Sequence, residues 1–382
     1  MKKIRIENLG QIKKAEIEFG DFNVFVGPQA SGKSILLQTM KLMLDAMDIK
    51  RTNKKYGYEW KQNPGDFLNL YYGEGMQGII NPATVLSNDD KLVSVKELMQ
   101  QKRGKRNEEL FFIPAQRVIT IQNGWPRNFM NYDSLDPYVV KHFSESLRLL
   151  MDAGLGSGRA SNIFPQEGKM KKSVRDKLIH SIFFDARVEL DKSSPKKRIM
   201  LSVNGNNLPY MVWSAGQREF MPLLLGLYWL MPSSKISKRK GINWVVIEEP
   251  EMGLHPMAIQ ALLLAFLELM NRGYKVVIST HSPVILELCW VISHIKRLKA
   301  NPEVLFDLFE LPKGPNLKSI FTQVVNDSTF KTFFFNRTPD GVSVKDISSL
   351  DPANSEMEEA DWGGLTSFSS RVSEIVSTLN ME

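Results

Sequence analysis

The sequence predicts an α/β fold whose central sheet is mostly parallel. One sign is the apolar run 22–26, followed by a Gly-rich turn and a helix from Ser34 to Met47 with helical spacing of its apolar residues. A second sign is the alternation of helical and strand-like stretches later in the chain (217–230, 242–247, 256–271 and 274–279). Because a helix that connects two neighbouring strands leaves them parallel, these stretches favour a parallel sheet.

The N-terminal third adds antiparallel elements. Residues 3–19 alternate apolar and polar side chains around a turn at Asn8–Gln11, so we expect a hairpin that leads into the first parallel strand. Residues 48–105 are polar, aromatic and Gly-rich. Within them we expect short strands near Leu68–Tyr72 and Gly78–Ile80.

The middle of the chain interrupts the alternating pattern. The segment Phe111–Arg117 is typical of a buried strand that ends in a polar loop. An amphipathic helix is then expected over 137–151, a break at Gly154–Gly158, and a second helix near 174–184. We therefore predict a small helical insertion over residues 131–195.

The C-terminal half returns to strands and helices. Residues 198–213 are two strand-like runs on either side of Asn204-Gly205, a strong hairpin signal. A last strand is expected near 333–344. The predicted organisation is an N-terminal part of the main domain with an antiparallel β subdomain, the insertion, a C-terminal part of the main domain and an acidic tail (1–130, 131–195, 196–345 and 346–382).

Composition indicates the compartment. Cys289 is the single cysteine, which fits a reducing cytosol. The start of the chain does not resemble a signal peptide, and the longest apolar run, 220–231, is too short to span a bilayer. We therefore expect a cytoplasmic protein without a membrane partner.

Charge is unevenly distributed along the chain. The formal net charge is +7, yet residues 340–382 contain nine acids and only two bases. Basic clusters occur elsewhere (50–55, 102–106, 169–177, 192–198 and 235–240). Such clusters bind nucleic acid in some proteins and are solvated loops in more of them. No aromatic residues are interleaved with the bases here, which favours solvated loops and leaves DNA as an alternative partner.

The turn after the first parallel strand carries the clearest chemical signal. Its residues are Gly27, Pro28, Gln29, Ala30, Ser31, Gly32, Lys33 and Ser34. In this pattern, backbone amides and the helix N-terminus hold the phosphates of a nucleotide. Lys33 is expected to reach the β- and γ-phosphates, and the Ser34 hydroxyl is expected to face Mg²⁺. The alternative is an ordinary Gly-rich surface turn.

Acidic and histidine side chains follow two of the buried strands. Glu248 and Glu249 end the strand 242–247, and His281 follows the strand 274–279. We expect Glu248 to hold the metal and Glu249 to orient or deprotonate the attacking water. His281 can donate a hydrogen bond to the γ-phosphate. The alternatives are a pair of acids at a strand end and a histidine in a turn.

A second anion site is expected where the helix 217–230 begins. Ser214, Ala215, Gly216 and Gln217 lie at its start, and a helix N-terminus attracts phosphate. The same residues could act only as a helix cap.

Together these segments resemble the ATP-binding-cassette (ABC) class of P-loop NTPases. Within that class, Glu248-Glu-Pro-Glu-Met-Gly-Leu-His-Pro256 and Ser279-Thr-His-Ser-Pro283 look like the AAA-type soluble ATPases related to the overcoming-lysogenization-defect (OLD) nucleases. The resemblance implies an ABC-like ATPase head that binds ATP and Mg²⁺ and forms homodimers or higher oligomers. Ser214–Gln217 of one copy would close over the ATP held by another copy. The resemblance also makes Gln116 a candidate sensor of the γ-phosphate and metal.

The same resemblance implies a role. Many relatives of this kind belong to bacterial anti-phage systems, so we expect an ATPase that controls a separate effector, a nuclease or a toxin. The acidic segment that follows the expected last strand is only about forty residues long and contains no Asp-x-Asp pair, so we expect no nuclease domain in this chain. The alternative function is a DNA-engaging repair or structural-maintenance ATPase. A transporter subunit is disfavoured by Pro250 and by the Gly253–Pro256 turn.

Overall fold

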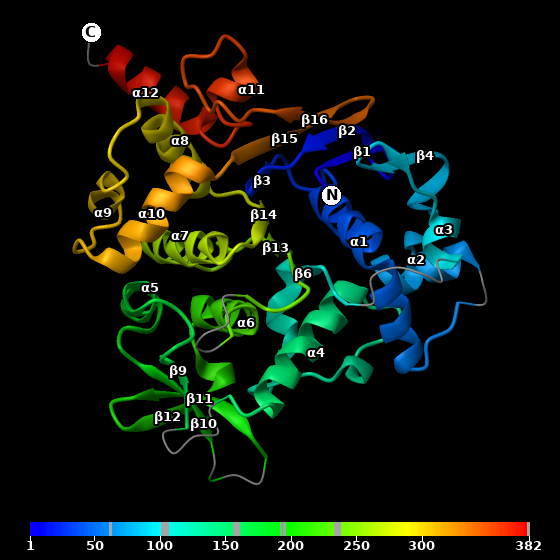
Figure 1. Cartoon of the computed structure of the whole chain (residues 1–382), viewed down its shortest axis with the longest axis horizontal. Helices are drawn as coiled ribbons and strands as arrows, with labels where there is room; N and C mark the ends of the chain where they lie inside the picture. Colours follow the sequence, from blue (N-terminus) through cyan, green and yellow to red (C-terminus); the bar gives the residue numbers. More distant parts are fainter. Residues whose placement is uncertain are drawn as a thin grey trace.

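The computed structural model describes residues 1–60, 63–100, 107–155, 161–191, 193, 196–232 and 238–379. In this part of the chain, ten strands form one large sheet (Figure 1). In sheet order they are β5 (Lys91–Leu92), β4 (Ile80–Asn88), β1 (Lys3–Leu9), β2 (Ile12–Glu18), β16 (Gly341–Asp346), β15 (Phe330–Thr338), β3 (Phe22–Val26), β14 (Lys275–Ser279), β13 (Trp244–Glu248) and β6 (Leu110–Ile113).

The sheet has a parallel half and a mixed half. Strands β15, β3, β14, β13 and β6 run parallel to one another. The predicted hairpin of β1 and β2 is present, and β1 also pairs with β4 in the antiparallel sense. The hairpin of β15 and β16 joins the two halves, because β16 pairs with both β15 and β2. The predicted α/β class with a mostly parallel central sheet is confirmed.

Helices cover both faces of the parallel half, so its strands are apolar on both sides. One face packs on α1 (Lys33–Lys55) and α2 (Pro64–Tyr72) through residues such as Phe25 and Val246. The other face packs on helices that Figure 1 shows on the opposite side of β3, β14 and β13. These are α6 (Ala215–Leu230), α7 (Pro256–Asn271), α8 (Pro283–Leu298) and α10 (Pro315–Asp327).

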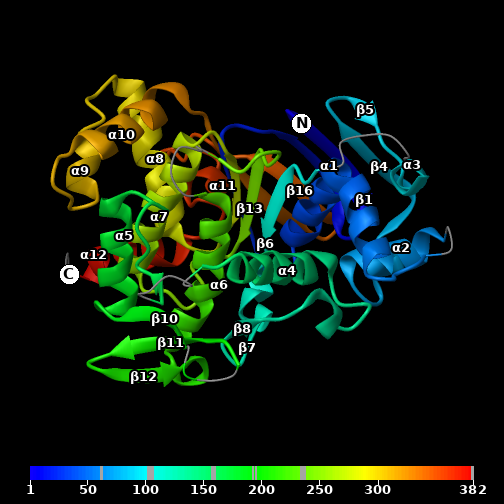
Figure 2. The ribbon, with the colours of Figure 1, turned by 60° about the horizontal axis from the view of Figure 1, so that its bottom comes forward.

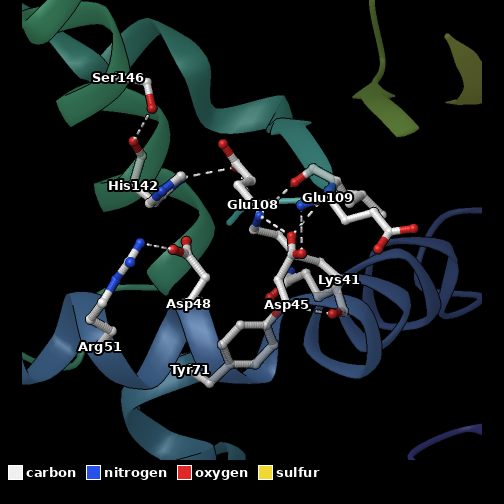
Figure 3. Close-up of polar contacts among 11 residues, drawn as sticks. Lys41, Asp45, Asp48, Arg51, Tyr71, Glu108, Glu109, His142 and Ser146 are labelled. Carbon is white, nitrogen blue, oxygen red and sulfur yellow. Dashed lines mark hydrogen bonds and ion pairs between the residues drawn. The ribbon is translucent and has the colours of Figure 1, made fainter. Parts of the chain in front are cut away.

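Helix α1 is longer than the predicted helix and is bent. Asp45 has non-helical dihedral angles, with φ −117° and ψ 17°. Its carboxylate accepts hydrogen bonds from the backbone amides of Glu109 at 2.8 Å and Leu110 at 3.1 Å (Figure 3). The bend therefore fastens the middle of α1 to the beginning of β6.

A separate four-stranded antiparallel sheet lies at one end of the molecule, below α5 and α6 in Figure 2. It consists of β12 (Asn206–Pro209), β11 (Arg198–Val203), β10 (Arg187–Asp191) and β9 (Asn162–Phe164). The predicted hairpin at Asn204-Gly205 is present as β11 and β12. The expected helical insertion contains α4 (Tyr138–Asp152) and α5 (Lys172–Leu178), and it also supplies β9 and β10.

The strand predicted near Leu68–Tyr72 is wrong, because these residues belong to α2. Asn63 caps that helix by accepting from the Gly65 amide, and Pro64 occupies its first turn. The strand expected at Gly78–Ile80 begins only at Ile80.

The remaining elements are short or peripheral. They are the hairpin of β7 (Ile121–Gln122) and β8 (Trp125–Pro126), the 3₁₀ turns η1 (Met76–Gly78), η2 (Ala115–Thr120), η3 (Phe129–Asn131) and η5 (Tyr210–Val212), the π-helical turn η4 (Ile179–Phe183), and the helices α3 (Val95–Gln100), α9 (Val304–Leu308), α11 (Met357–Ala360) and α12 (Ser367–Leu379). Among the described helices, none combines the length and apolarity needed to cross a bilayer.

Candidate functional site

The strand order brings the predicted site segments to one edge of the sheet. Strands β3, β14, β13 and β6 are consecutive and parallel, so their carboxyl ends lie side by side. The loop 27–32, His281, the pair Glu248–Glu249 and Gln116 follow these four strands in that order. Thr280 fastens the edge further, because its amide donates to the Phe25 carbonyl at 3.0 Å. Ligands of α/β proteins bind at this edge.

The phosphate loop has a backbone that needs its glycines. Gly27 has φ 144° and Gly32 has φ 91°, values that L side chains disfavour. A Cβ on Gly27 would lie 2.7 Å from the Phe335 carbonyl oxygen, so the loop packs tightly on β15. Gln11 supports the loop from the β1–β2 turn, where its Nε2 donates to the Ala30 carbonyl at 3.0 Å. Pro28 and its two successors are exposed, which leaves the outer side of the loop open.

Lys33 lies across the mouth of this loop. Its Nζ donates to the carbonyls of Gly27 at 2.8 Å and Pro28 at 2.9 Å, and it is 3.4 Å from the Ser31 hydroxyl. Burial lowers the pKa of Lys33 to about 8, although nearby glutamates, Glu249 first, oppose this. In the described part of the chain, no carboxylate forms an ion pair with this ammonium. A phosphate in the loop would supply the missing negative charge.

Glu248 and Ser34 fit a divalent cation. Glu248 is 2 % exposed, and its Oε2 accepts from the Ala115 amide at 3.2 Å. Its other oxygen, Oε1, is buried without a hydrogen-bond partner among the described residues. Burial raises the pKa of this carboxyl, and the neighbouring Ser34 hydroxyl partly offsets the increase. A buried carboxylate oxygen without a donor, beside a serine hydroxyl, is a suitable donor set for Mg²⁺.

Glu249 and His281 face each other at the edge. His281 Nε2 is 3.9 Å from Glu249 Oε1, and each side chain is about one-third exposed. Glu249 has φ 43°, an unfavourable conformation for this residue type, and its amide donates to the Ser279 carbonyl at 2.9 Å. Burial lowers the pKa of His281, and the nearby Lys33 ammonium adds to this effect. A neutral histidine and a carboxylate therefore lie next to the phosphate loop.

Two residues of the site were not assigned a role from the sequence. Arg117 is fully buried and donates to the backbone carbonyls of Glu248 at 2.9 Å and Glu249 at 3.0 Å. Glu251 Oε1 accepts from the Thr280 hydroxyl at 2.7 Å and from the His281 amide at 2.6 Å. Both residues position the acids and the histidine. Their sequence signals were an arginine after a buried strand and the third acid of Glu-Glu-Pro-Glu.

The segment Ser214–Gln217 caps α6. The Gln217 amide donates to the Ser214 hydroxyl at 3.3 Å, and the Ser214 amide donates to Gln217 Oε1 at 3.2 Å. Gly216 packs against the turn after the acids, where an added Cβ would lie 2.5 Å from the Gly253 carbonyl oxygen. Among the described residues, no hydrogen bond joins this segment to the phosphate loop of the same chain.

Two predicted features remain, Gln116 and the basic clusters. Gln116 follows β6 and is exposed at the same edge. The basic cluster 102–106 lies outside the described residues, as do residues 192, 194 and 195 of the cluster 192–198 and residues 235–237 of the cluster 235–240.

Comparisons with known proteins give a family. The model of the family described as "AAA domain, putative AbiEii toxin, Type IV TA system" matches residues 22–287. The Old nuclease of Escherichia phage P2 is 21% identical over 293 residues, which cover 72% of this chain and 46% of that protein. The chain thus spans about half the length of this curated relative.

Solved structures with a similar course of the chain include an Smc head bound to the C-winged helix domain of ScpA, with a TM-score of 0.42 at 9% identity over 90% of this chain and 96% of that one. A dimeric bacterial ABC transporter cassette has a TM-score of 0.32 at 12% identity over 73% of this chain and 88% of that one. The family match spans the phosphate loop, the acids and His281, so the chain belongs to this AAA-domain family of P-loop ATPases.

Proposed function

We propose that the protein binds and hydrolyses ATP as an ABC-type ATPase and assembles into dimers or higher oligomers through composite ATP sites. One observation supports this most strongly. The phosphate loop, His281 and the pair Glu248–Glu249 follow three adjacent parallel strands, and Glu249 and His281 come within 3.9 Å of each other.

In the proposed mechanism, the amides of the loop and the N-terminus of α1 hold the β-phosphate. Lys33 releases its loop carbonyls and binds the β- and γ-phosphates. Ser34 and Glu248 are the residues that would hold Mg²⁺, which when bound neutralises charge on the phosphate oxygens.

Glu249 orients the attacking water and accepts its proton. His281 donates a hydrogen bond to the γ-phosphate, a role that suits an imidazole kept neutral by burial. Water then adds to the γ-phosphorus. The bond between the γ-phosphorus and the oxygen that bridges it to the β-phosphorus breaks, and ADP and phosphate result. Gln116, exposed at the same edge, is the proposed sensor of the γ-phosphate and metal.

The composite site is supported by where the two anion sites lie. Ser214–Gln217 is held by its own cap and by Gly253, and it has no hydrogen bond to the loop of its own chain among the described residues. We propose that this segment closes over ATP bound to a second copy.

The biological role that we propose is control of a separate effector, a nuclease or a toxin, in bacterial anti-phage defence. The similarity to the phage P2 Old nuclease and the toxin in the family description support this class of effector. Purification of the tagged Glu249→Gln protein from its native host, followed by mass spectrometry, would identify the effector. Recovery of this chain alone, with and without ATP, would argue against one.

The alternative is an ATPase that engages DNA. It predicts hydrolysis stimulated by duplex DNA and binding that weakens steeply with salt. Equal hydrolysis with and without DNA would favour the first function.

The central enzymatic test compares ATP hydrolysis by wild type, Lys33→Ala, Glu249→Gln and Glu310→Gln. Glu310 has a positive φ like Glu249 but lies away from the loop, so its variant is a matched control. We expect the first two variants to lose at least 100-fold in rate and Glu310→Gln to match wild type. Equal turnover by all four proteins would contradict the assignment.

A further inference from the structure

A cavity of about 520 Å³ lies at the other end of α1 from the phosphate loop. The last turns of α1, one side of α4 and the segments that precede β6 and β13 surround it. Fifteen residues of α1 separate Lys33 from Asp48, the first wall residue, which corresponds to about 22 Å. The volume is in the range of small-molecule sites. This cavity is therefore separate from the proposed ATP site.

The carboxylates that line the cavity are already paired. The pairs are Asp48 with Arg51 at 2.5 Å, Glu108 with Lys41 at 3.0 Å and Glu145 with Arg148 at 2.6 Å. Figure 3 shows the pair of Asp48 and Arg51, and it shows Glu108 between Lys41 and His142. Burial lowers the pKa of His142 to about 3, so this histidine adds no charge to the wall at neutral pH.

Three cations in the wall are not paired. Lys55, Arg239 and Lys240 line the cavity, and among the described residues none of them has a carboxylate within ion-pair distance. The Arg239 guanidinium lies 3.3 Å from the centre of the Trp229 ring, and this stacking holds it in the wall. Burial lowers the pKa of Arg239, and the negative charge of Glu108, which lies beyond ion-pair distance, opposes this only in part. An anion bound in the cavity would offset the free-energy cost of burying this guanidinium.

Neutral groups restrict the kind of anion. Trp229 belongs to the wall, and its Nε1 is buried without an acceptor among the described residues. The aromatic faces are occupied, because Trp229 packs between Arg239 and Phe111, and Tyr56 stacks on Phe129 at 4.3 Å. Single-stranded nucleic acid binds by stacking its bases on free aromatic faces, so a small anion fits this wall better.

We propose that this cavity binds a small, multiply charged anion that carries phosphate groups, held by Lys55, Arg239 and Lys240. The proposal does not depend on ATP hydrolysis. Two sources share this chemistry, inorganic pyrophosphate and phosphorylated sugars such as fructose 1,6-bisphosphate.

The test is calorimetric titration of both compounds into the full chain carrying Lys33→Ala, so that every protein has the same altered phosphate loop. We expect one site, and at least tenfold weaker binding when Lys55→Gln and Lys240→Gln are added. Both of these side chains are exposed, so their loss should leave the fold intact. Arg239→Gln should weaken binding to a similar extent. Lys91→Gln, an exposed lysine on β5 at the opposite edge of the sheet, should leave binding unchanged.

The two compounds distinguish the sources, since the tighter binder identifies the ligand class. Absence of binding at millimolar concentration, equal affinity in the Lys55→Gln and Lys240→Gln protein, or equal loss with Lys91→Gln would overturn the proposal. It would also be overturned if these variants abolished binding of a short DNA strand while neither phosphate compound bound the parent Lys33→Ala protein.

Discussion

Individual side chains in the site are positioned by buried partners that the chemistry does not use directly. Arg117 donates to the carbonyls of Glu248 and Glu249, and Glu251 joins the acidic turn to Thr280 and His281. The conformation of Glu249, with φ 43°, is therefore supported from both sides. We therefore expect the proposed ATP hydrolysis to depend on these positioning residues as well.

Replacement of Arg117 by Lys tests this dependence. One ammonium cannot reach all three carbonyls that the guanidinium contacts, those of Glu219, Glu248 and Glu249. We expect a loss of about 3 kcal/mol in the free energy of unfolding, measured in urea, together with slower ATP hydrolysis. The exposed Arg337→Lys is the matched control. Unchanged stability and unchanged rate in Arg117→Lys would contradict the positioning role.

His142 predicts a pH dependence of stability. Burial, with a further contribution from Lys41, lowers the pKa of His142 to about 3 in the folded chain, compared with about 6.5 when unfolded. The unfolded chain therefore binds one more proton between these values. This contribution to stability is complete above pH 6.5 and is lost as the pH falls toward 3.

The expected slope from this residue is about 1.4 kcal/mol per pH unit between pH 6 and 4. The free energy of unfolding, measured in urea across this range, should fall less steeply with falling pH in His142→Gln than in wild type. The difference in slope should correspond to about one bound proton. The exposed His180→Gln should keep the slope of wild type. Identical slopes in wild type and His142→Gln would show that the buried histidine makes no such contribution.

A close contact between two elements links the start of α6 to the turn after β13. The first turn of α6 and the turn after β13 approach so closely that Gly216 and Gly253 have no room for a side chain between them. The segment that would contact ATP of another copy therefore rests on the turn that follows Glu249. We expect a shift of the Ser214–Gln217 segment to displace the turn after Glu249, and the reverse.

Gly216→Ala tests this contact. Alanine normally stabilises a helix relative to glycine, but here its Cβ would lie 2.5 Å from the Gly253 carbonyl oxygen. We expect a loss of roughly 1–3 kcal/mol in stability, measured by thermal unfolding. Gly78→Ala, where nothing lies within 4 Å of the added Cβ, should stay close to wild type. A stabilised Gly216→Ala protein would rule out the close packing.

Local sequence patterns predicted most of the parallel half, because its strands are continuous apolar runs that end in Gly, acids or His. The prediction failed at Leu68–Tyr72, where Asn63 and Pro64 start a helix and outweigh the strand-like side chains. The strands β9 and β10 were missed because they are only three and five residues long. Segments this short become strands only by pairing within the second sheet. Arg117 was missed because its partners are backbone carbonyls far away in sequence.

At the scale of the whole molecule, the proposed function places half of one ATP site and half of another on each chain. The phosphate loop, Glu249 and His281 share one sheet edge, whereas Ser214–Gln217 is held by α6 and has no hydrogen bond to that loop among the described residues. Two copies in head-to-head contact would complete two sites. ATP would then link subunits as well as serve as substrate.

The most direct measurement is the solution mass of the Glu249→Gln protein with and without ATP and Mg²⁺. We expect the mass of one chain without nucleotide, and that of two chains or a larger assembly with it. Addition of Ser214→Arg should prevent the assembly, while Glu310→Gln in place of Glu249→Gln should not trap it. A mass that ATP leaves unchanged, or an ATP-dependent assembly that survives Ser214→Arg, would contradict the composite site.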